Sequence, residues 1–473
     1  MMDRLEQYFL EAQGKDKEEI SSNNPYRKIG FDGDKRRLGW ARITPFNLIE
    51  DSLSGISPLL EGKENFIFVG MGGSINGIKT LFSLFKGHKL FALDSLDPAA
   101  TKAILKKIKN INKTLVIAIS KSGTTQETQL LSLTLREVFG SNWQKHFLWL
   151  ADPLAFEKLE TLGWKGVQMR HIQFDAQADV GGRFSCPHTL IFFLPLFLLM
   201  KQNINKLKQV YDIYLSSLDN SRHEAYLFAE EYKDKEPAYF FPQVKGNLGA
   251  SFSSWIVQLF QESLGSKKEN FSVKTTGFLK AKNSLFLPIK LKAKIDNPVA
   301  SLMSQMYFFQ AFVAFYSAFK DINFVDQEFV EKYKDAMRKI EGSKTGDINL
   351  LNLSQVIKEV KERISNKQKF IEVVLYFYPS KEIIRKVDKA FSRAFGDRMI
   401  FVFIGSDWNH HSYQAAFADK NTFYVFLLAL DYTSTLEGIS PATLKKNIEK
   451  LKIISKATHL TLEDKSFLFR YSR

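Results

Sequence analysis

Residues 114–128 read TLVIAISKSGTTQET and decide the fold class of this chain. The first part, TLVIAIS, is rich in β-branched and aliphatic residues, which is typical of a central strand covered on both faces. The second part, SKSGTTQET, opens a helix directly after the strand, so hydroxyl groups, the flexible Gly123 and backbone N–H groups gather at a helix N-terminus. This setting favours a bound phosphate dianion. Thr124 and Glu127 also fit a capping box, but a cap needs one hydroxyl and the loop offers four across six residues.

On both sides of this segment, short apolar runs alternate with amphipathic stretches. The expected strands are 66–69, 90–93, 114–120, 146–151 and 171–174, and the expected helices are 76–85, 99–109 and 128–139. Strands that alternate with helices predict a parallel sheet wrapped by helices on both faces.

A second pattern of the same kind follows the polar stretch 216–223. It comprises expected strands at 238–241, 370–378, 399–405 and 422–430, expected helices at 249–264, 299–319 and 327–340, and a polar linker at 342–355. We therefore expect an α/β protein with two parallel-sheet domains. The expected limits are an N-terminal helical segment at 1–45, a first domain at 46–205, a second at 206–433 and a C-terminal helical tail at 434–473.

Composition excludes several classes of protein. The 473 residues carry 66 Lys and Arg against 51 Asp and Glu, a net charge of +15, and 45% are hydrophobic, as in ordinary globular proteins. A single cysteine, Cys186, rules out internal disulfides and a cysteine-based zinc cluster. The N-terminus is charged throughout, and the longest apolar run, 190–200, contains Pro195 and is too short to cross a bilayer. We expect a soluble cytoplasmic protein that binds no membrane and, because its basic residues are scattered, no nucleic acid.

A glycine-rich turn, GMGGS at 70–74, has the same strand–turn–helix setting as the Ser/Thr loop. It lacks the spacing of a dinucleotide fingerprint, and the Ser/Thr loop lacks a Walker lysine pattern. Parallel sheets bind ligands at the carboxyl ends of their strands. We therefore expect Gly73 and Ser74 to form the opposite wall of one small-ligand pocket.

Several motifs together resemble those of the glucose-6-phosphate isomerase family. They are GMGGS, SKSGTTQET, DVGGRFS at 179–185, QLFQESLG at 258–265 and DQEFVEKYK at 326–334, in this order. A histidine motif, NHHSYQ at 409–414, follows the lysine, and this order is similar to the isomerase half of bifunctional transaldolase/glucose-6-phosphate isomerases. The sequence departs from the family pattern at Phe329, where a small residue is usual, and at Ser266, where Lys is usual.

The resemblance implies two sugar-isomerase domains of the flavodoxin-like type and a phosphosugar in the cleft between them. It further implies a homodimer in which the histidine reaches the site of the neighbouring subunit, with no metal and no cofactor. The implied catalytic residues are Glu262, His410, Lys334 and Arg183. The implied substrate contacts are Gly73, Ser74, Ser120, Lys121, Ser122, Thr125, Gln258 and Gln327. His410 is preferred to His411 because it keeps a four-residue spacing to Gln414.

The residue chemistry fits this activity independently. An aldose–ketose isomerase needs a carboxylate base, an acid/base group that opens the sugar ring and a cation near the enediolate. Glu262 can be the base, and Gln258 lies one helical turn before it on the same face. Gln327 and Lys334 are seven residues apart, so a continuous helix would turn both toward one site.

Two alternatives to glucose-6-phosphate isomerisation stay open at this point. The first is isomerisation of another hexose phosphate, such as mannose 6-phosphate. The second is a non-catalytic protein that binds phosphosugars, although Glu262 and Lys334 would then have no use. The sequence predicts no role for the residues after Asp431.

Overall fold

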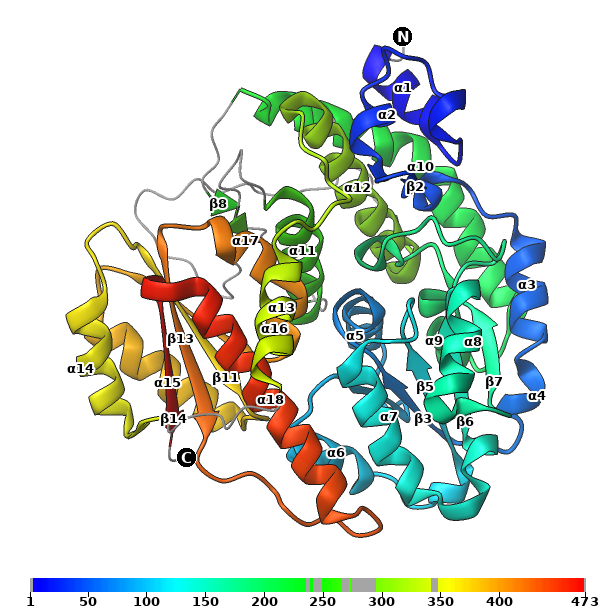
Figure 1. Cartoon of the computed structure of the whole chain (residues 1–473). Coiled ribbons are helices and arrows are strands. Elements are labelled where there is room, and N and C mark those ends of the chain that lie inside the picture. Colours follow the sequence, from blue (N-terminus) through cyan, green and yellow to red (C-terminus); the bar gives the residue numbers. More distant parts are fainter. Residues whose placement is uncertain are drawn as a thin grey trace. The chain divides into compact units, whose positions relative to one another are not determined.

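The computed structural model describes residues 3–234, 239–240, 249–265, 272–273, 295–341 and 348–471 (Figure 1). Residue contacts divide the chain into two compact units that interleave along the sequence. Unit 1 comprises residues 1–92, 112–125 and 144–326, and unit 2 comprises residues 93–111, 126–143 and 327–473. None of the helices in the described part combines the length and the apolar character that crossing a lipid bilayer requires.

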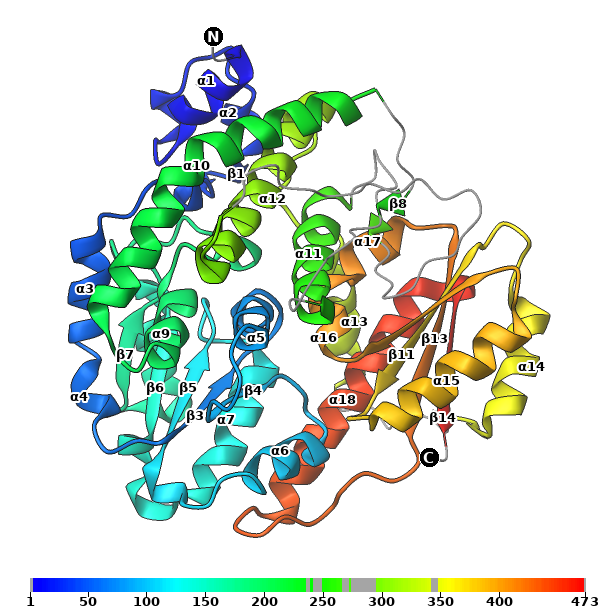
Figure 2. The ribbon, with the colours of Figure 1, turned by 180° about the vertical axis from the view of Figure 1, so that it is seen from behind.

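The sheet of unit 1 has the strand order β4-β3-β5-β6-β7 (Figure 2). Its strands are β3 (Asn65–Val69), β4 (Leu90–Leu93), β5 (Thr114–Ile119), β6 (Phe147–Ala151) and β7 (Gln168–His171). The pairs β3–β5, β5–β6 and β6–β7 are parallel. Every residue of β3, β5 and β6 is buried, as the continuous apolar runs predict. The last strand lies three residues earlier than the expected 171–174.

The main core of unit 1 lies on one face of this sheet. Alternate strand residues such as Phe68, Ile117 and Leu148 belong to it, together with apolar residues of the surrounding helices. These helices are α5 (Asn76–Ser83), α9 (Leu190–Leu199), α10 (Ile204–Tyr232), α11 (Gly249–Leu264) and α12 (Pro298–Lys320). On the other face, the ring of Trp149 packs edge-on against Trp164, with a centroid distance of 5.1 Å.

The polar stretch 216–223, after which a second pattern was expected to begin, lies inside α10. Ser217 and Ser221 are buried, and the Ser217 hydroxyl bonds to the Ser304 hydroxyl of α12 at 2.6 Å. Small hydroxyl side chains here allow the two helices to pack closely, so polarity does not mark a boundary.

The other elements of unit 1 are short. They are α1 (Arg4–Ala12), α2 (Tyr26–Ile29), α3 (Phe46–Ser54), α4 (Ser57–Leu60), α8 (Phe156–Leu159) and the pairs β1–β2 (Phe31–Asp32, Lys35–Arg36) and β8–β9 (Tyr239–Phe240, Ser272–Val273). The N-terminal segment, expected to be helical, therefore also contains an antiparallel pair of strands. Of the strand expected at 238–241, residues 238 and 241 lie outside the described residues.

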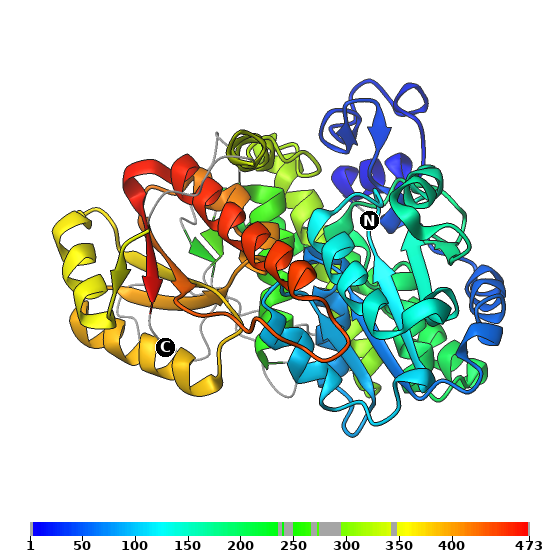
Figure 3. The ribbon, with the colours of Figure 1, turned by 60° about the horizontal axis from the view of Figure 1, so that its bottom comes forward.

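The sheet of unit 2 is parallel and has the order β10-β14-β13-β11-β12. Its strands are β10 (Leu350–Leu351), β11 (Phe370–Tyr376), β12 (Met399–Ile404), β13 (Thr422–Ala429) and β14 (Ser466–Tyr471). Apolar residues of α14 (Leu353–Arg363) and α15 (Lys381–Ala394) share a core with one face of the sheet. Figure 3 shows α18 (Pro441–Leu462) on the face opposite α15. The remaining helices are α6 (Pro98–Leu105), α7 (Gln126–Val138), α13 (Val330–Ile340), α16 (Asp407–His411) and α17 (Tyr413–Ala418).

Two expectations for unit 2 need correction. The polar linker expected at 342–355 holds β10 and the start of α14, while residues 342–347 lie outside the described residues. The C-terminal tail, expected to be helical, ends its described part with β14 between β10 and β13. Both strands pair with partners remote in sequence, and their local sequence does not reveal such pairing. The two parallel sheets themselves confirm the predicted fold class.

Candidate functional site

Two glycine-rich turns touch through their backbones in unit 1. A Cβ atom on Gly73 would lie 2.3 Å from the carbonyl carbon and oxygen of Gly182 and 2.6 Å from the Arg183 nitrogen. No side chain fits in this space, so a glycine is required at position 73. The GMGGS and DVGGRFS motifs therefore meet, and Arg183 extends from their contact.

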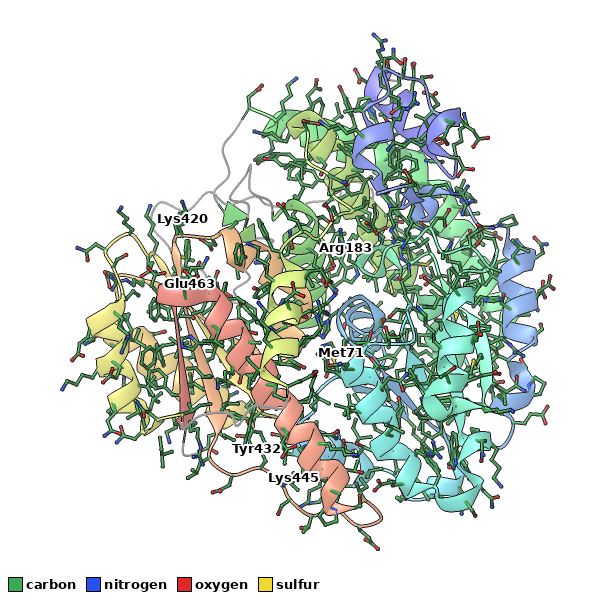
Figure 4. All side chains as sticks on the ribbon, viewed as in Figure 1. Met71, Arg183, Lys420, Tyr432, Lys445 and Glu463 are labelled. Atoms are coloured by element: carbon green, nitrogen blue, oxygen red, sulfur yellow. The ribbon has the colours of Figure 1, made fainter. Side chains whose placement is uncertain are left out.

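Arg183 is labelled in Figure 4. Its side chain is buried, and neutral groups and one carboxylate fix its position. Its Nε donates to the Ser263 hydroxyl at 2.7 Å and its Nη2 donates to the Phe324 carbonyl at 2.6 Å. Its Nη1 lies 3.7 Å from Glu262 Oε2. Burial lowers the pKa of Arg183 from its ordinary value, and Glu262 opposes that shift. The guanidinium is thus a cation held in one orientation.

Glu262 belongs to a chain of polar side chains that includes Arg183. Gln258 Nε2 donates to Glu262 Oε1 at 3.3 Å, and Asn76 Nδ2 donates to Gln258 Oε1 at 2.9 Å. Gln258 and Glu262 are one turn apart on α11, as their spacing predicts. Glu262 keeps 9% of its surface exposed, so its carboxylate is oriented by neighbours on two sides but not sealed from solvent.

The Ser/Thr loop follows β5. Gly123 has a φ of 67°, a conformation that glycine adopts without strain, and its N–H bonds to the Ser120 carbonyl at 3.1 Å. The Ser120 and Thr125 hydroxyls are 2.9 Å apart, as are those of Ser122 and Thr124. The hydroxyl groups thus gather in a tight turn, and phosphate binding by this loop stays a prediction.

The ammonium group of Lys121, in the same loop, contacts other groups of the protein. Its ammonium donates to the Val180 carbonyl and lies 3.5 Å from Asp152 Oδ2. Burial lowers the pKa of Lys121, and Asp152 opposes that shift. This side chain therefore ties the loop to the residues before Arg183.

In unit 2, His410 pairs with a carboxylate that the sequence did not assign to the site. His410 Nε2 lies 2.8 Å from Glu127 Oε1, and the two side chains are 21% and 9% exposed. Burial favours the neutral carboxyl group of Glu127, but His410, a backbone hydrogen bond and Lys450 together outweigh burial, and the pKa of Glu127 is lowered. His411 is buried and its Nδ1 contacts the Ser412 hydroxyl. Pairing with a carboxylate supports the choice of His410 over His411.

Lys334 and Gln327 do not lie on one helix, so the expected helix at 327–340 is wrong at its start. Helix α13 begins at Val330, and Gln327 precedes it. Lys334 is 40% exposed in its side chain and pairs with Glu331 at 2.7 Å. The Phe329 N–H donates to Gln414 Oε1 at 3.0 Å. The lysine motif and the histidine motif are therefore in direct contact through Phe329 and Gln414.

Among the described residues, no three His, Cys, Asp or Glu side chains converge in a way that could hold a metal ion. Cys186 is buried against Gly77, where an added Cβ would lie 2.3 Å from the sulfur. Burial raises the pKa of its thiol, which makes Cys186 an unreactive packing residue.

Sequence reasoning missed three polar residues of these arrangements: Asn76, Ser263 and Glu127. Asn76 follows the GMGGS motif and Ser263 lies inside QLFQESLG, but nothing in their local pattern indicates a partner. The sequence did single out Glu127, but only as the second residue of a possible capping box with Thr124. The buried first turn of α7 brings its carboxylate to His410 instead.

Comparisons with known proteins connect these arrangements to a family. Residues 59–215 match the family model described as phosphoglucose isomerase. A glucose-6-phosphate isomerase of Campylobacter jejuni is 31% identical over 237 residues, which cover 48% of this chain and 56% of that relative. This chain spans about half the length of the curated relatives that it matches first.

Two solved structures share the fold. A glucose-6-phosphate isomerase of Chlamydia trachomatis superposes with a TM-score of 0.53 at 15% identity, covering 72% of this chain and 83% of that one. A hypothetical protein of Thermus thermophilus gives a TM-score of 0.51 at 20% identity, covering 72% and 95%. These superpositions confirm the predicted α/β architecture.

Proposed function

Because residues 59–215 match the phosphoglucose isomerase family model, we propose that this chain interconverts glucose 6-phosphate and fructose 6-phosphate. The observation that carries the proposal is the contact of Arg183 with Glu262, at 3.7 Å, on the Gln258 face of α11. In such a pair the carboxylate can take a proton from the substrate, and the fixed cation can stabilise the negative charge that results. A protein that only binds phosphosugars has no need for this combination.

We assign proton transfer between carbons to Glu262. Its carboxylate removes the proton from C2 of the open-chain aldose, and the electron pair moves to the carbonyl oxygen at C1 to form a cis-enediolate. The Arg183 guanidinium stabilises this anion. Glu262 then returns the proton to C1, the hydroxyl proton of the C2 oxygen passes to the C1 oxygen, the C2 oxygen becomes a carbonyl, and the product is the ketose. Atoms and charge balance without a further reactant.

We assign ring opening to His410 together with Lys334. An imidazole can give and take a proton near neutral pH, which opening of the hemiacetal requires. An ionised Glu127 accepts from His410 Nε2 and so fixes the orientation of the ring. Lys334 places a positive charge near the ring oxygen in this assignment, and Gln327 contacts a sugar hydroxyl.

We assign the phosphate group to the Ser/Thr loop. The hydroxyls of Ser120, Ser122 and Thr125 supply donors at the start of α7, and Gly73 and Ser74 supply the facing turn. Lys121 contributes its backbone N–H, since its ammonium group already bonds to Val180.

We further propose a cytoplasmic homodimer that acts in glycolysis and gluconeogenesis, with no metal or cofactor. Isomerisation of mannose 6-phosphate is the nearest alternative, because no described contact fixes the configuration at C2. Turnover of mannose 6-phosphate beside fructose 6-phosphate discriminates between the two substrates.

The test measures fructose 6-phosphate turnover by the purified protein, coupled to glucose-6-phosphate dehydrogenase. We expect Glu262→Gln to lose activity by roughly a hundredfold or more, since it removes the base and keeps the shape. Glu359→Gln, the same change on the outer helix α14, is the matched control and should match the wild type. Equal activity in wild type and Glu262→Gln would contradict the assigned base. Absence of turnover together with binding of the sugar phosphate would favour the non-catalytic alternative.

A further inference from the structure

Helix α18 lies along α7 in unit 2 and is fixed to it by side-chain hydrogen bonds. The backbone N–H of Ser440 donates to Glu137 Oε2 at 2.6 Å, and the Thr443 hydroxyl also donates to Glu137. One turn further, Asn447 Nδ2 donates to the Thr134 hydroxyl at 2.8 Å. Later residues of α18 thus meet earlier residues of α7, so the two helices are antiparallel and α18 continues toward the turn of α7 that carries Glu127.

The second half of α18 holds the segment that carries His410. Asn409 Nδ2 donates to the Thr458 hydroxyl at 2.6 Å, and Asn409 Oδ1 accepts from the Tyr376 hydroxyl at 2.7 Å. All three side chains are buried. Asn409 is therefore clamped between a strand of the sheet and α18, and the next residue in the chain is His410. Thr461, one turn beyond, accepts from the Tyr413 hydroxyl at 2.8 Å.

Between these contacts, α18 places a buried cation near Glu127. The side chain of Lys450 is 8% exposed and pairs with Glu341 at the end of α13. After burial and His410, Lys450 is a further influence on the pKa of Glu127, and it lowers that pKa. His410 and Lys450 are thus the two charged groups that favour the ionised Glu127 carboxyl.

We propose that α18 is the element that positions the Glu127–His410 pair, and that Thr458 is its main positioning residue. Through Asn447 and Thr134 the helix sets the place of α7, and through Thr458 and Asn409 it sets the place of α16. Glu127 and His410 are far apart in sequence, and the helices that carry them are both hydrogen-bonded to α18. This inference rests on the proposed function for its catalytic meaning, but the positioning itself is a property of the protein without substrate.

The experiment compares Thr458→Val with Thr458→Ser. Valine keeps the shape and removes the hydroxyl, whereas serine keeps the hydroxyl. Ser455→Ala is the matched control. The buried Ser455 hydroxyl donates to the Lys452 carbonyl, so its hydrogen bond stays within α18. The first measurement is the titration of the Glu127 carboxyl by carbon-13 NMR in the protein without substrate. The second is kcat and KM for fructose 6-phosphate.

For Thr458→Val we expect the pKa of Glu127 to rise, because a displaced His410 no longer offsets burial. We expect kcat to fall by about tenfold to a hundredfold with little change in KM, since Thr458 acts through His410 and not on the sugar. Thr458→Ser should restore both values. If Thr458→Val does not fold, Tyr376→Phe removes the other hydroxyl that holds Asn409 and is measured in the same way.

Two results would overturn the proposal. One is an unchanged Glu127 titration and an unchanged kcat in Thr458→Val. The other is an equal effect of Ser455→Ala, which would indicate a general loss of stability. If the Glu127 pKa shifts and serine restores it while no variant or wild type isomerises the sugar, the positioning stands and the proposed function fails.

Discussion

At the residue scale, Gly73 is the position with the least freedom in the candidate site. The carbonyl group of Gly182 and the nitrogen of Arg183 occupy the space that a side chain would need. The backbone nitrogen of Arg183 is part of this contact. A displacement of either glycine-rich turn would therefore move the guanidinium that faces Glu262.

We expect Gly73→Ala to destabilise the protein by about 1–3 kcal/mol, because backbone atoms cannot yield as a flexible side chain can. Activity should fall along with stability, since the Arg183 turn must move. Gly182→Ala is the matched control on the other side of the same contact, because its added Cβ would meet no atom within 4 Å. Thermal unfolding of both variants is the measurement, and equal melting temperatures would contradict the clash.

Sequence reasoning at this scale succeeded where the chemistry is local. The spacing of Gln258 and Glu262 placed both on one face of a helix, and the structure confirms it. Reasoning failed where the partner is remote: nothing near Asn76 predicts Gln258, 182 residues away, and nothing near Glu127 predicts His410, 283 residues away. Such pairs are set by packing of elements that local propensity does not determine.

At the element scale, the start of a helix was the weakest prediction. Gln327 was expected on the helix of Lys334, yet α13 begins at Val330. The Phe329 N–H at this start bonds to Gln414 of another helix, so a tertiary contact satisfies a backbone donor there. The sequence offers no serine, threonine or asparagine cap at this place that would have marked the boundary.

A charged contact at the end of another helix gives a pH-dependent prediction. The Lys465 ammonium donates to the carbonyls of Ala416, Phe417 and Asp419 at 2.7, 2.6 and 3.0 Å, and thereby covers the C-terminus of α17. Burial lowers the pKa of Lys465 to about 8 from its ordinary value of 10.5. Between these two values the unfolded chain holds the proton that the folded protein has released. The contribution of Lys465 to the free energy of unfolding therefore rises with pH in this window.

We expect the stability difference between wild type and Lys465→Met to shift in favour of the wild type as the pH rises from about 8 to 10. Urea unfolding at several pH values measures it. A difference that stays constant over this range would show that the folded protein keeps the proton on Lys465.

At the scale of the whole molecule, both parallel sheets were predicted, because β3, β5, β11 and β13 consist mainly of apolar residues, as suits strands that are buried along their whole length. The interleaving of the two units was not predicted. Helices α6 and α7 belong by their contacts to unit 2, although the strands before and after them lie in the sheet of unit 1. Periodicity identifies an amphipathic helix but not which of two sheets it accompanies.

The proposed homodimer, in which His410 of the partner subunit serves the site of Glu262, gives a prediction for mixed variants. Glu262→Gln and His410→Ala should each be inactive alone. After the two are unfolded together and refolded as an equal mixture, random pairing should restore about a quarter of the wild-type activity, because half of the dimers are hybrids with one intact site of two. No recovery in hybrids of confirmed composition would place both residues of a site in the same chain.

The position of β14 between β10 and β13 has a consequence for biosynthesis. The short strand β10 ends at Leu351 and its partner β14 begins at Ser466, about 115 residues later. At roughly 5–20 residues per second, the ribosome adds this stretch in about 6–23 s. Throughout that time β10 lacks its partner, and once β13 has been made at residues 422–429 its edge stays open until β14 follows. Chaperones that bind nascent chains should therefore engage the second sheet for longer than the first, whose strands are complete by residue 171.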